Sequence, residues 1–198
     1  MQHNDFSQFL FEFPMLTLNK HEIFPTPIWH LEDTPQDIID VLKQGAYEAK
    51  EKHSNAQRSN QGGYQSPCYE WEDFPVKEYF NKLLVSIPFS NKSKVQIKGI
   101  NAPSWWYNIN SKGSWNVVHT HPDTSLALIL YLTDTNHELS ILNPHHHTRH
   151  FLHDFYHYIS PTTKKGDILI FPADLMHFVK PNESERDRIC VSMNLLLC

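Results

Sequence analysis

The chain has 198 residues, of which 40% are hydrophobic and 20% charged, proportions that indicate one folded domain and exclude a disordered chain. The net charge is −5, and no run of lysine or arginine exceeds two residues, so nothing points to nucleic acid or an anionic membrane as a partner. Three cysteines, no long apolar stretch and no secretory signal predict a cytoplasmic protein. We expect a small-molecule or protein side-chain partner, while the oligomeric state stays open.

The first half of the chain predicts a strand and two helices. Residues 22–31 mix β-forming residues with two prolines, as in an edge strand. Apolar residues then recur at helical spacing from Thr34, a candidate N-cap, to about Lys52. A second helix is expected at 75–87, and the polar, glycine-containing segment 53–67 between the two is interpreted as a loop.

From residue 95 onward the pattern changes to short β-type runs separated by turn residues. Seven such runs, with no helical period between them, predict an antiparallel two-sheet barrel or jelly roll, with the helices outside one sheet. The runs are 95–100, 104–109, 115–119, 125–132, 138–142, 167–171 and 188–197. The expected fold class is mainly β. We expect one domain over 1–198, with support at about 22–90 and the core at about 95–198.

The most informative motif is His-Thr-His-Pro-Asp at residues 119–123. Side chains at positions i and i+2 of a strand project to the same side, so His119 and His121 can chelate one metal ion. A third imidazole, His177, follows the apolar run 167–171. Three ligands on one face, with open positions opposite, are the arrangement of a catalytic Fe(II) centre.

A second ligand set uses the neighbouring carboxylate. If the register slips by two residues, His121, Asp123 and His177 form a triad of two histidines and one carboxylate. Spacing favours the three-histidine set, because His119 ends an apolar run whereas Pro122 begins a turn. A neutral imidazole in place of a carboxylate leaves an Fe(II) site with one more positive charge.

Arg188 opens the last predicted strand and is a candidate anion-binding residue. Alternation puts it on one face with Cys190, Ser192 and Asn194. A guanidinium binds a carboxylate through two parallel hydrogen bonds, so Arg188 can anchor the far end of a dicarboxylic acid, assisted by the Ser192 hydroxyl. Further candidate hydroxyl donors on neighbouring strands are Tyr131 and Tyr107.

In their order along the chain, these motifs resemble the 2-oxoglutarate and Fe(II)-dependent oxygenases, above all the group related to prolyl 4-hydroxylase. The resemblance covers residues 22–197 and rests on Phe24-Pro25-Thr26-Pro27-Ile28-Trp29, the segment 59–66, Trp106-Tyr107-Asn108-Ile109-Asn110 with Gly113, the His-x-His-Pro motif, Leu130-Tyr131-Leu132, the segment 166–172 with His177, and Arg188 with Ser192 and Asn194. It implies a double-stranded β-helix of the cupin-like, jelly-roll type.

The same resemblance implies an activity and roles for single residues. The family couples oxidative decarboxylation of 2-oxoglutarate to hydroxylation of a substrate, with Fe(II) and dioxygen. His119 and His177 match the family's metal-binding histidines, and Arg188 matches the residue that pairs with the 5-carboxylate of 2-oxoglutarate. His121 departs from the pattern, because the wider superfamily has an aspartate there.

Two other functions stay open at this point. A cupin-like enzyme with zinc or manganese could use the same three histidines without an oxoacid. A non-catalytic β-sandwich binding module would carry the histidines incidentally. The histidine-rich segment from His145 to His157 is interpreted as a polar loop near the barrel mouth, with contact to substrate as its functional alternative.

Overall fold

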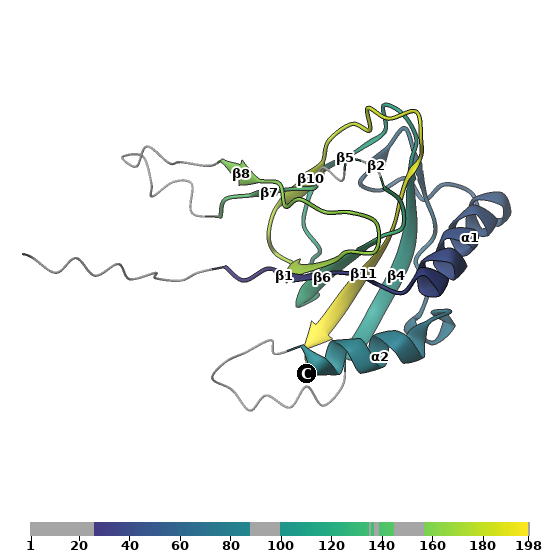
Figure 1. The fold of residues 1–198 in the computed structure, drawn as a ribbon. Helices are drawn as coiled ribbons and strands as arrows, with labels where there is room; N and C mark the ends of the chain where they lie inside the picture. Colours follow the sequence, from purple (N-terminus) through teal and green to yellow (C-terminus); the bar gives the residue numbers. More distant parts are fainter. Residues whose placement is uncertain (1–25, 88–99, 135, 137–138, 145–156, 198) are drawn as a thin grey trace, which may run out of the picture.

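The structure is a computed structural model that describes residues 26–87, 100–134, 136, 139–144 and 157–197. Two antiparallel sheets and two helices make up this part of the chain (Figure 1). The predicted mainly-β, two-sheet fold is confirmed. Several predicted features lie outside the described residues, namely 22–25, 95–99 and the histidines between 145 and 156.

The larger sheet has the strand order β1-β9-β6-β11-β4-β3. Its strands are β1 (Trp29–Leu31), β3 (Tyr64–Gln65), β4 (Ile100–Asn110), β6 (Leu126–Tyr131), β9 (Ile168–Pro172) and β11 (Arg188–Leu197). All six residues of the central strand β6 are buried, because both faces of this sheet are covered. One face meets the helices, and the other meets the smaller sheet.

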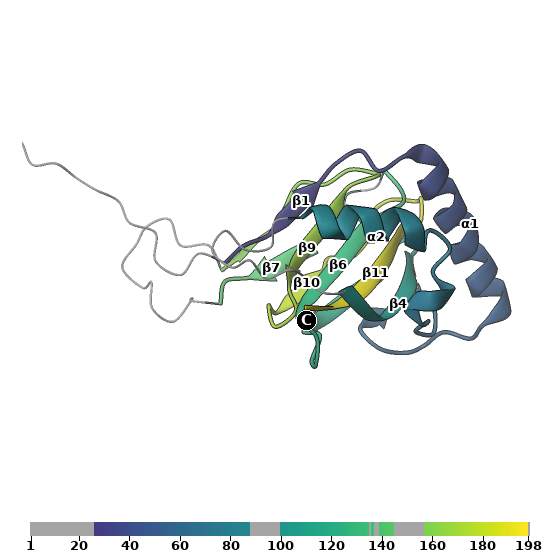
Figure 2. The same cartoon turned by 90° about the horizontal axis from the view of Figure 1, so that it is seen from below.

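The helices cover one face of the larger sheet (Figures 1 and 2). They are α1 (Gln36–Lys52) and α2 (Lys77–Ser86), with a 3-10 turn at Trp71–Asp73 between them. Leu42 of α1 and Phe80 of α2 are fully buried in one apolar cluster with Leu128 and Val191 of the sheet. Within the described part of the chain, neither helix is long and apolar enough to span a membrane.

Both predicted helices are confirmed, but the expected N-cap is wrong. Pro35 precedes the first helical residue of α1, and no side chain caps that end. The backbone N–H of Thr34 instead donates to the carbonyl oxygen of Gly166, at 3.0 Å. Thr34 therefore ties the start of α1 to the turn before β9.

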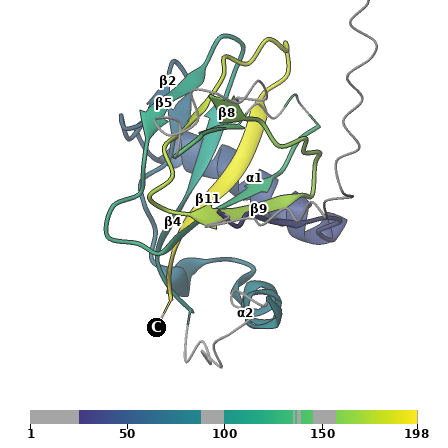
Figure 3. The ribbon, with the colours of Figure 1, turned by 90° about the vertical axis from the view of Figure 1, so that its left-hand side faces the viewer.

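The smaller sheet has the strand order β2-β5-β10-β7-β8. Its strands are β2 (Asn60–Gln61), β5 (Trp115–His119), β7 (Leu139–Leu142), β8 (Tyr158–Ile159) and β10 (His177–Val179). Seen from the side, β8 lies in front of the long strands β4 and β11, and α1 lies behind them (Figure 3). Side chains from both sheets, including Ile129, Ile141 and Phe171, form a second apolar cluster between them.

The segment 53–67 differs from its predicted loop, because it contains two short strands, β2 and β3, which with the turn between them we call the β2–β3 hairpin. Its two strands join different sheets: β2 pairs with β5, and β3 pairs with β4. Gly62 turns the chain at a φ of 77°, and Gly63 has no room for a side chain, since a Cβ there would lie 2.6 Å from the Ile109 carbonyl oxygen. The hairpin thus closes one edge of the space between the sheets.

Candidate metal centre

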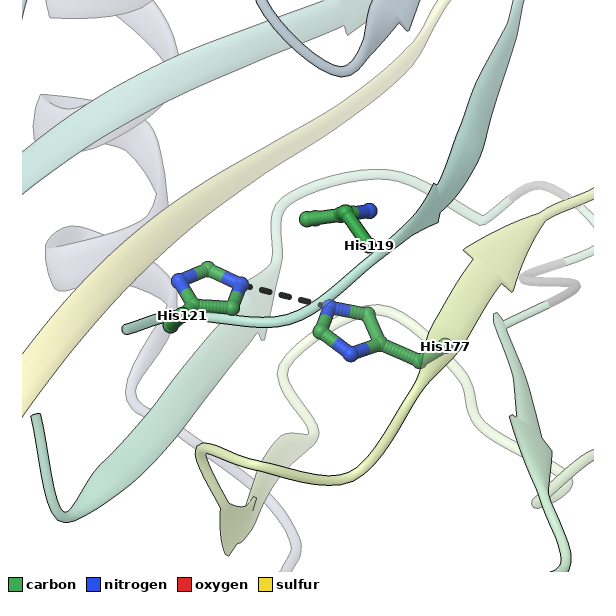
Figure 4. A group of neighbouring side chains, drawn as sticks. All are labelled: His119, His121 and His177. Atoms are coloured by element: carbon green, nitrogen blue, oxygen red, sulfur yellow. Dashed lines mark hydrogen bonds between the residues drawn. The ribbon is translucent and has the colours of Figure 1, made fainter. Parts of the chain in front are cut away.

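Three histidines converge between the two sheets (Figure 4). His119 ends β5 and His177 begins β10, and the antiparallel pairing of these strands places the two residues directly opposite each other. His121 follows two residues after the end of β5, where its backbone N–H donates to the Ala173 carbonyl oxygen at 2.9 Å. One ligand nitrogen from each imidazole lies within 4.8 Å of the other two.

Each imidazole is oriented by a hydrogen bond from its Nδ1. His119 Nδ1 lies 2.7 Å from the Val117 carbonyl oxygen, and His177 Nδ1 lies 2.8 Å from the Leu175 carbonyl oxygen. A carbonyl oxygen only accepts, so both Nδ1 atoms carry the proton and both Nε2 atoms keep a lone pair. His121 Nδ1 makes the equivalent contact to Asn194 Oδ1, at 2.6 Å.

Two of these lone pairs face each other across a short distance. His121 Nε2 and His177 Nε2 lie 3.2 Å apart (Figure 4), and with both protons on Nδ1 neither atom can donate to the other. Imidazole nitrogens bind divalent transition metals at about 2.0–2.1 Å, so ligands in neighbouring positions at 90° lie about 3 Å apart. The donor set therefore fits a metal ion that two imidazoles share, with His119 as third ligand.

Burial keeps this donor set neutral. Loss of solvent lowers the pKa of His121 to about 4 and the pKa of His177 to about 3, and it also lowers the pKa of His119. The other histidines lower the pKa of His177 further, because a second positive charge nearby is unfavourable. Metal binding requires neutral imidazole, so all three residues are competent ligands near neutral pH.

The alternative carboxylate ligand lies elsewhere. Asp123 is exposed, in the turn between β5 and β6, with a φ of 63°. It is absent from the group of potential ligand atoms that the three histidines form. This geometry favours the three-histidine set over the set of His121, Asp123 and His177.

Two adjoining cavities lie beside the histidines. The first is lined by His119, His121, His177, Ser59, Trp106, Asn108, Asn116, Ala127, Leu128, Ile129, Val179, Cys190 and Ser192. The second is lined by Asn110, Asn116, Ile129, Tyr131, Leu139, Val179, Arg188 and Cys190. Asn116, Ile129, Val179 and Cys190 belong to both linings, so the two cavities lie next to each other and together make up the space between the histidines and the guanidinium.

Arg188 is buried at the far end of this space. Its Nη2 donates to the Lys180 carbonyl oxygen at 2.9 Å, which fixes the side chain toward the cavity's second half. Tyr131 lines the same part, and burial raises the pKa of its hydroxyl, which stays protonated. The structure therefore brings Tyr131 and Arg188 together, as the sequence predicted.

The other two predicted oxoacid-binding residues lie in different places. Ser192 lines the histidine cavity and not the Arg188 cavity, so it is near the metal end. Tyr107 does not lie at the site at all, and this prediction is wrong. Its side chain is on the helix side of β4, where a Cβ at Gly45 of α1 would approach its hydroxyl to 2.5 Å.

Two residues at the site were not identified from the sequence. Alternation placed Asn194 on the same face of its strand as Arg188, but it did not predict the contact with His121. That contact depends on where the chain turns after β5. Trp106 was named only within the motif 106–110, and in the structure it stacks on the His121 ring, with ring centroids 5.6 Å apart and planes 22° apart. Both residues hold His121 in the orientation that points Nε2 at His177.

Replacing Asn194 by leucine is expected to weaken Fe(II) binding about 10- to 100-fold, because partners that orient a metal ligand contribute this much to affinity. Asn194→Asp keeps an acceptor for His121 Nδ1 and should retain most of the affinity. Competition against a chromogenic chelator measures both values. Equal affinities for Asn194→Leu and the unmodified chain would show that this contact does not position His121.

The metal-free protein is expected to lose stability as the pH falls below about 6.5. In the unfolded chain a histidine takes up a proton near pH 6.5, whereas folded His121 and His177 stay neutral down to about pH 4 and 3. The unfolded state then binds more protons, so the free energy of unfolding falls with pH, by about 1–2 kcal/mol per histidine at pH 5. Urea unfolding of metal-free protein at pH 7 and pH 5 measures this. His177→Gln should reduce the difference in the free energy of unfolding between the two pH values. An unchanged difference would contradict the lowered pKa of His177.

The fold is that of the Fe(II)- and 2-oxoglutarate-dependent oxygenases. The prolyl-4-hydroxylase of Pseudomonas putida superimposes with a TM-score of 0.59 over 87% of this chain and 94% of that chain, at 15% identity. A viral collagen prolyl hydroxylase from Paramecium Bursaria Chlorella virus-1, in complex with 2-oxoglutarate, gives 0.58, with coverages of 85% and 94% and 16% identity. HygX from Streptomyces hygroscopicus, with nickel and 2-oxoglutarate bound, gives 0.62, with coverages of 86% and 82% and 11% identity.

The sequence also matches a family model. The matched residues are 104–194, and the model is described as "Putative 2OG-Fe(II) oxygenase". A search among curated proteins found no match. The predicted resemblance, the double-stranded β-helix and the oxygenase class are thereby confirmed, with Fe(II), 2-oxoglutarate and dioxygen as the family's cofactor and co-substrates.

Proposed function

We propose that the chain is a hydroxylase that binds Fe(II) through His119, His121 and His177 and binds 2-oxoglutarate between this centre and Arg188. The observation that carries the proposal is the pair of opposed Nε2 lone pairs, 3.2 Å apart, beside a cavity that adjoins the cavity of a buried guanidinium. The overall reaction consumes 2-oxoglutarate and dioxygen, and it yields succinate, carbon dioxide and the hydroxylated substrate.

Bound Fe(II) would supply the redox chemistry, and the protein's residues bind and orient the reactants. Three neutral imidazoles leave the ion's two positive charges uncompensated, and the carboxylate at the 2-oxo end of 2-oxoglutarate would offset one of them. Arg188 fixes the far carboxylate through paired hydrogen bonds, and Tyr131 adds a protonated hydroxyl. Ile129 and Val179, which line both halves of the space, exclude water around the chain of the oxoacid.

We propose a protein side chain or a small metabolite as the substrate. The fold neighbours include prolyl hydroxylases and also HygX crystallised with hygromycin B, so this fold accommodates both classes. Among the described residues, the metal cavity is lined by the three neutral histidines and by uncharged side chains. This lining favours an uncharged group at the position that is hydroxylated.

The proposal is tested by reconstituting the purified chain with Fe(II), 2-oxoglutarate and dioxygen. We expect slow formation of succinate in the absence of a substrate, faster formation with the correct substrate, and a product heavier by one oxygen atom. Zinc and manganese serve as controls. Activity with zinc or manganese and no consumption of 2-oxoglutarate would instead support the cupin-like alternative.

A further inference from the structure

The hairpin motif at residues 59–66 contributes directly to the metal cavity. Ser59, which precedes β2, lines the cavity with the three histidines but does not line the Arg188 cavity. Its backbone carbonyl oxygen accepts from Val117 N–H at 3.0 Å, so the residue is fixed to β5 next to the strand end that carries His119. Ser59 is therefore at the metal end of the space.

A buried amide in the same hairpin has its orientation fixed by the backbone. The N–H of Gly63 donates to the Asn60 side chain at 3.1 Å, so the atom that accepts must be Oδ1. The amide nitrogen of Asn60 then faces the side-chain oxygens of Asn110, at 2.7 Å, and Asn108, at 3.5 Å. Asn60 is 4% exposed, so water does not compete for these contacts.

The orientation of Asn60 determines the orientation of each side chain in a hydrogen-bonded series that ends at Ser59. Asn110 accepts from Asn60, and its own Nδ2 donates to Asn116 Oδ1 at 3.0 Å. Asn116 Nδ2 in turn donates to Ser59 Oγ at 3.2 Å. The Ser59 Oγ thus accepts a hydrogen bond from Asn116. The proton of the Ser59 hydroxyl has no acceptor among the described residues. The proton is available to a molecule in the cavity.

Among the described residues that line the metal cavity, Ser59 and Ser192 are the two that carry a hydroxyl group. A 2-oxo acid places its carboxylate and keto oxygen at the metal, while Arg188 lines only the adjoining cavity. Hydrogen bonds to a charged group are worth more than those between neutral groups. Because the Ser59 Oγ already accepts from Asn116, the Ser59 hydroxyl can donate its proton to this carboxylate.

We propose that the Ser59 hydroxyl donates a hydrogen bond to the carboxylate at the 2-oxo end of the co-substrate, and that Asn60 is a positioning residue that keeps this hydroxyl a donor. The inference rests on the proposed function, since it assumes an oxoacid at the three histidines. It assigns to the hairpin a role in recognising the end of the oxoacid that Arg188 does not reach.

The test compares two oxoacids on the anaerobic Fe(II) protein, with affinity read from the visible charge-transfer band of the chelate. Pyruvate has the same 2-oxo end as 2-oxoglutarate but no second carboxylate. Ser59→Ala is expected to weaken both oxoacids by the same factor, about tenfold. Arg188→Ala should weaken 2-oxoglutarate and leave pyruvate unchanged.

Two further variants separate this role from a structural one. Ser140→Ala removes a buried hydroxyl from β7 of the same sheet, outside both cavities, and should leave both affinities unchanged. Asn60→Asp keeps the acceptor for Gly63 but removes the donor to Asn110. The side-chain amides of Asn110 and Asn116 then rotate by 180°, so that Ser59 donates to Asn116. This variant should weaken both oxoacids, but it should have no further effect in the Ser59→Ala background.

The outcomes distinguish the two proposals. Wild-type affinity for both oxoacids in Ser59→Ala, or a loss confined to 2-oxoglutarate, would overturn the role of Ser59 while leaving the proposed function intact. Failure of the unmodified protein to bind either oxoacid would overturn the proposed function itself, and with it this inference. Thermal unfolding shows whether each variant is folded. If Asn60→Asp does not fold, the oxoacid affinities of Ser59→Ala alone test the role of Ser59.

Discussion

Replacing His177 by alanine is expected to abolish Fe(II) binding under conditions that saturate the unmodified protein. The variant removes one of the two Nε2 atoms that face each other at 3.2 Å and leaves two imidazoles. Loss of a partner that only orients a ligand already costs 10- to 100-fold, so loss of the ligand itself should cost at least about 100-fold in affinity. Isothermal titration of the metal-free protein with Fe(II), without oxygen, measures the difference.

Two control variants show whether this loss is specific. His53→Ala removes an exposed histidine after α1, far along the chain from the metal ligands, and should bind Fe(II) normally. Asp123→Asn removes the alternative carboxylate, while asparagine still tolerates the positive φ of that position. Normal binding by His177→Ala would contradict the proposed centre.

Replacing Arg188 by alanine is expected to weaken 2-oxoglutarate binding at least about 100-fold, with Fe(II) affinity unchanged. The guanidinium is buried at the end of the cavity opposite the histidines, where loss of a charged, paired donor costs several kcal/mol. Anaerobic titration of the Fe(II) protein with 2-oxoglutarate measures this effect.

Arg188→Lys is the informative companion variant. Lysine keeps the positive charge but lacks the planar pair of donors, so it should recover only part of the affinity. Unchanged Fe(II) binding in both variants would show that the fold survives the loss of the Arg188 contact to Lys180. Full 2-oxoglutarate affinity in Arg188→Ala would rule out Arg188 as the anchor.

The sequence was sufficient for the features that follow from periodicity. The i and i+2 spacing of His119 and His121 predicted that they share a side, and the structure brings both to His177. Alternation on β11 likewise placed Cys190 and Ser192 at the cavity. Strand geometry was enough to predict these faces, whereas the approach of His121 to His177 also depends on the chain after β5, where the His121 N–H donates to the Ala173 carbonyl oxygen.

The errors concern features that depend on tertiary contacts. Over residues 105–110, β4 is buried on both faces, with Tyr107 and Ile109 on the helix side and Asn108 and Asn110 at the cavities. Tyr107 was assigned to the wrong face, because a tyrosine suits both an apolar core and a ligand site, and only the packing of α1 against β4 distinguishes the two. The strands β2 and β10 have two and three residues, too few to show a period, and they form because partner strands lie beside them. Asn60 gave no signal of its own, because its importance lies in contacts with distant asparagines.

The most direct test of the central claim is an anaerobic titration of the unmodified chain and of Asp123→Asn with Fe(II) and then 2-oxoglutarate, followed by visible absorption. Three histidines as metal ligands predict the same charge-transfer band in both proteins, saturating at one Fe(II) and one 2-oxoglutarate per chain. A band that disappears in Asp123→Asn would show that the carboxylate binds the metal. No band in the unmodified chain would contradict the oxoacid site altogether.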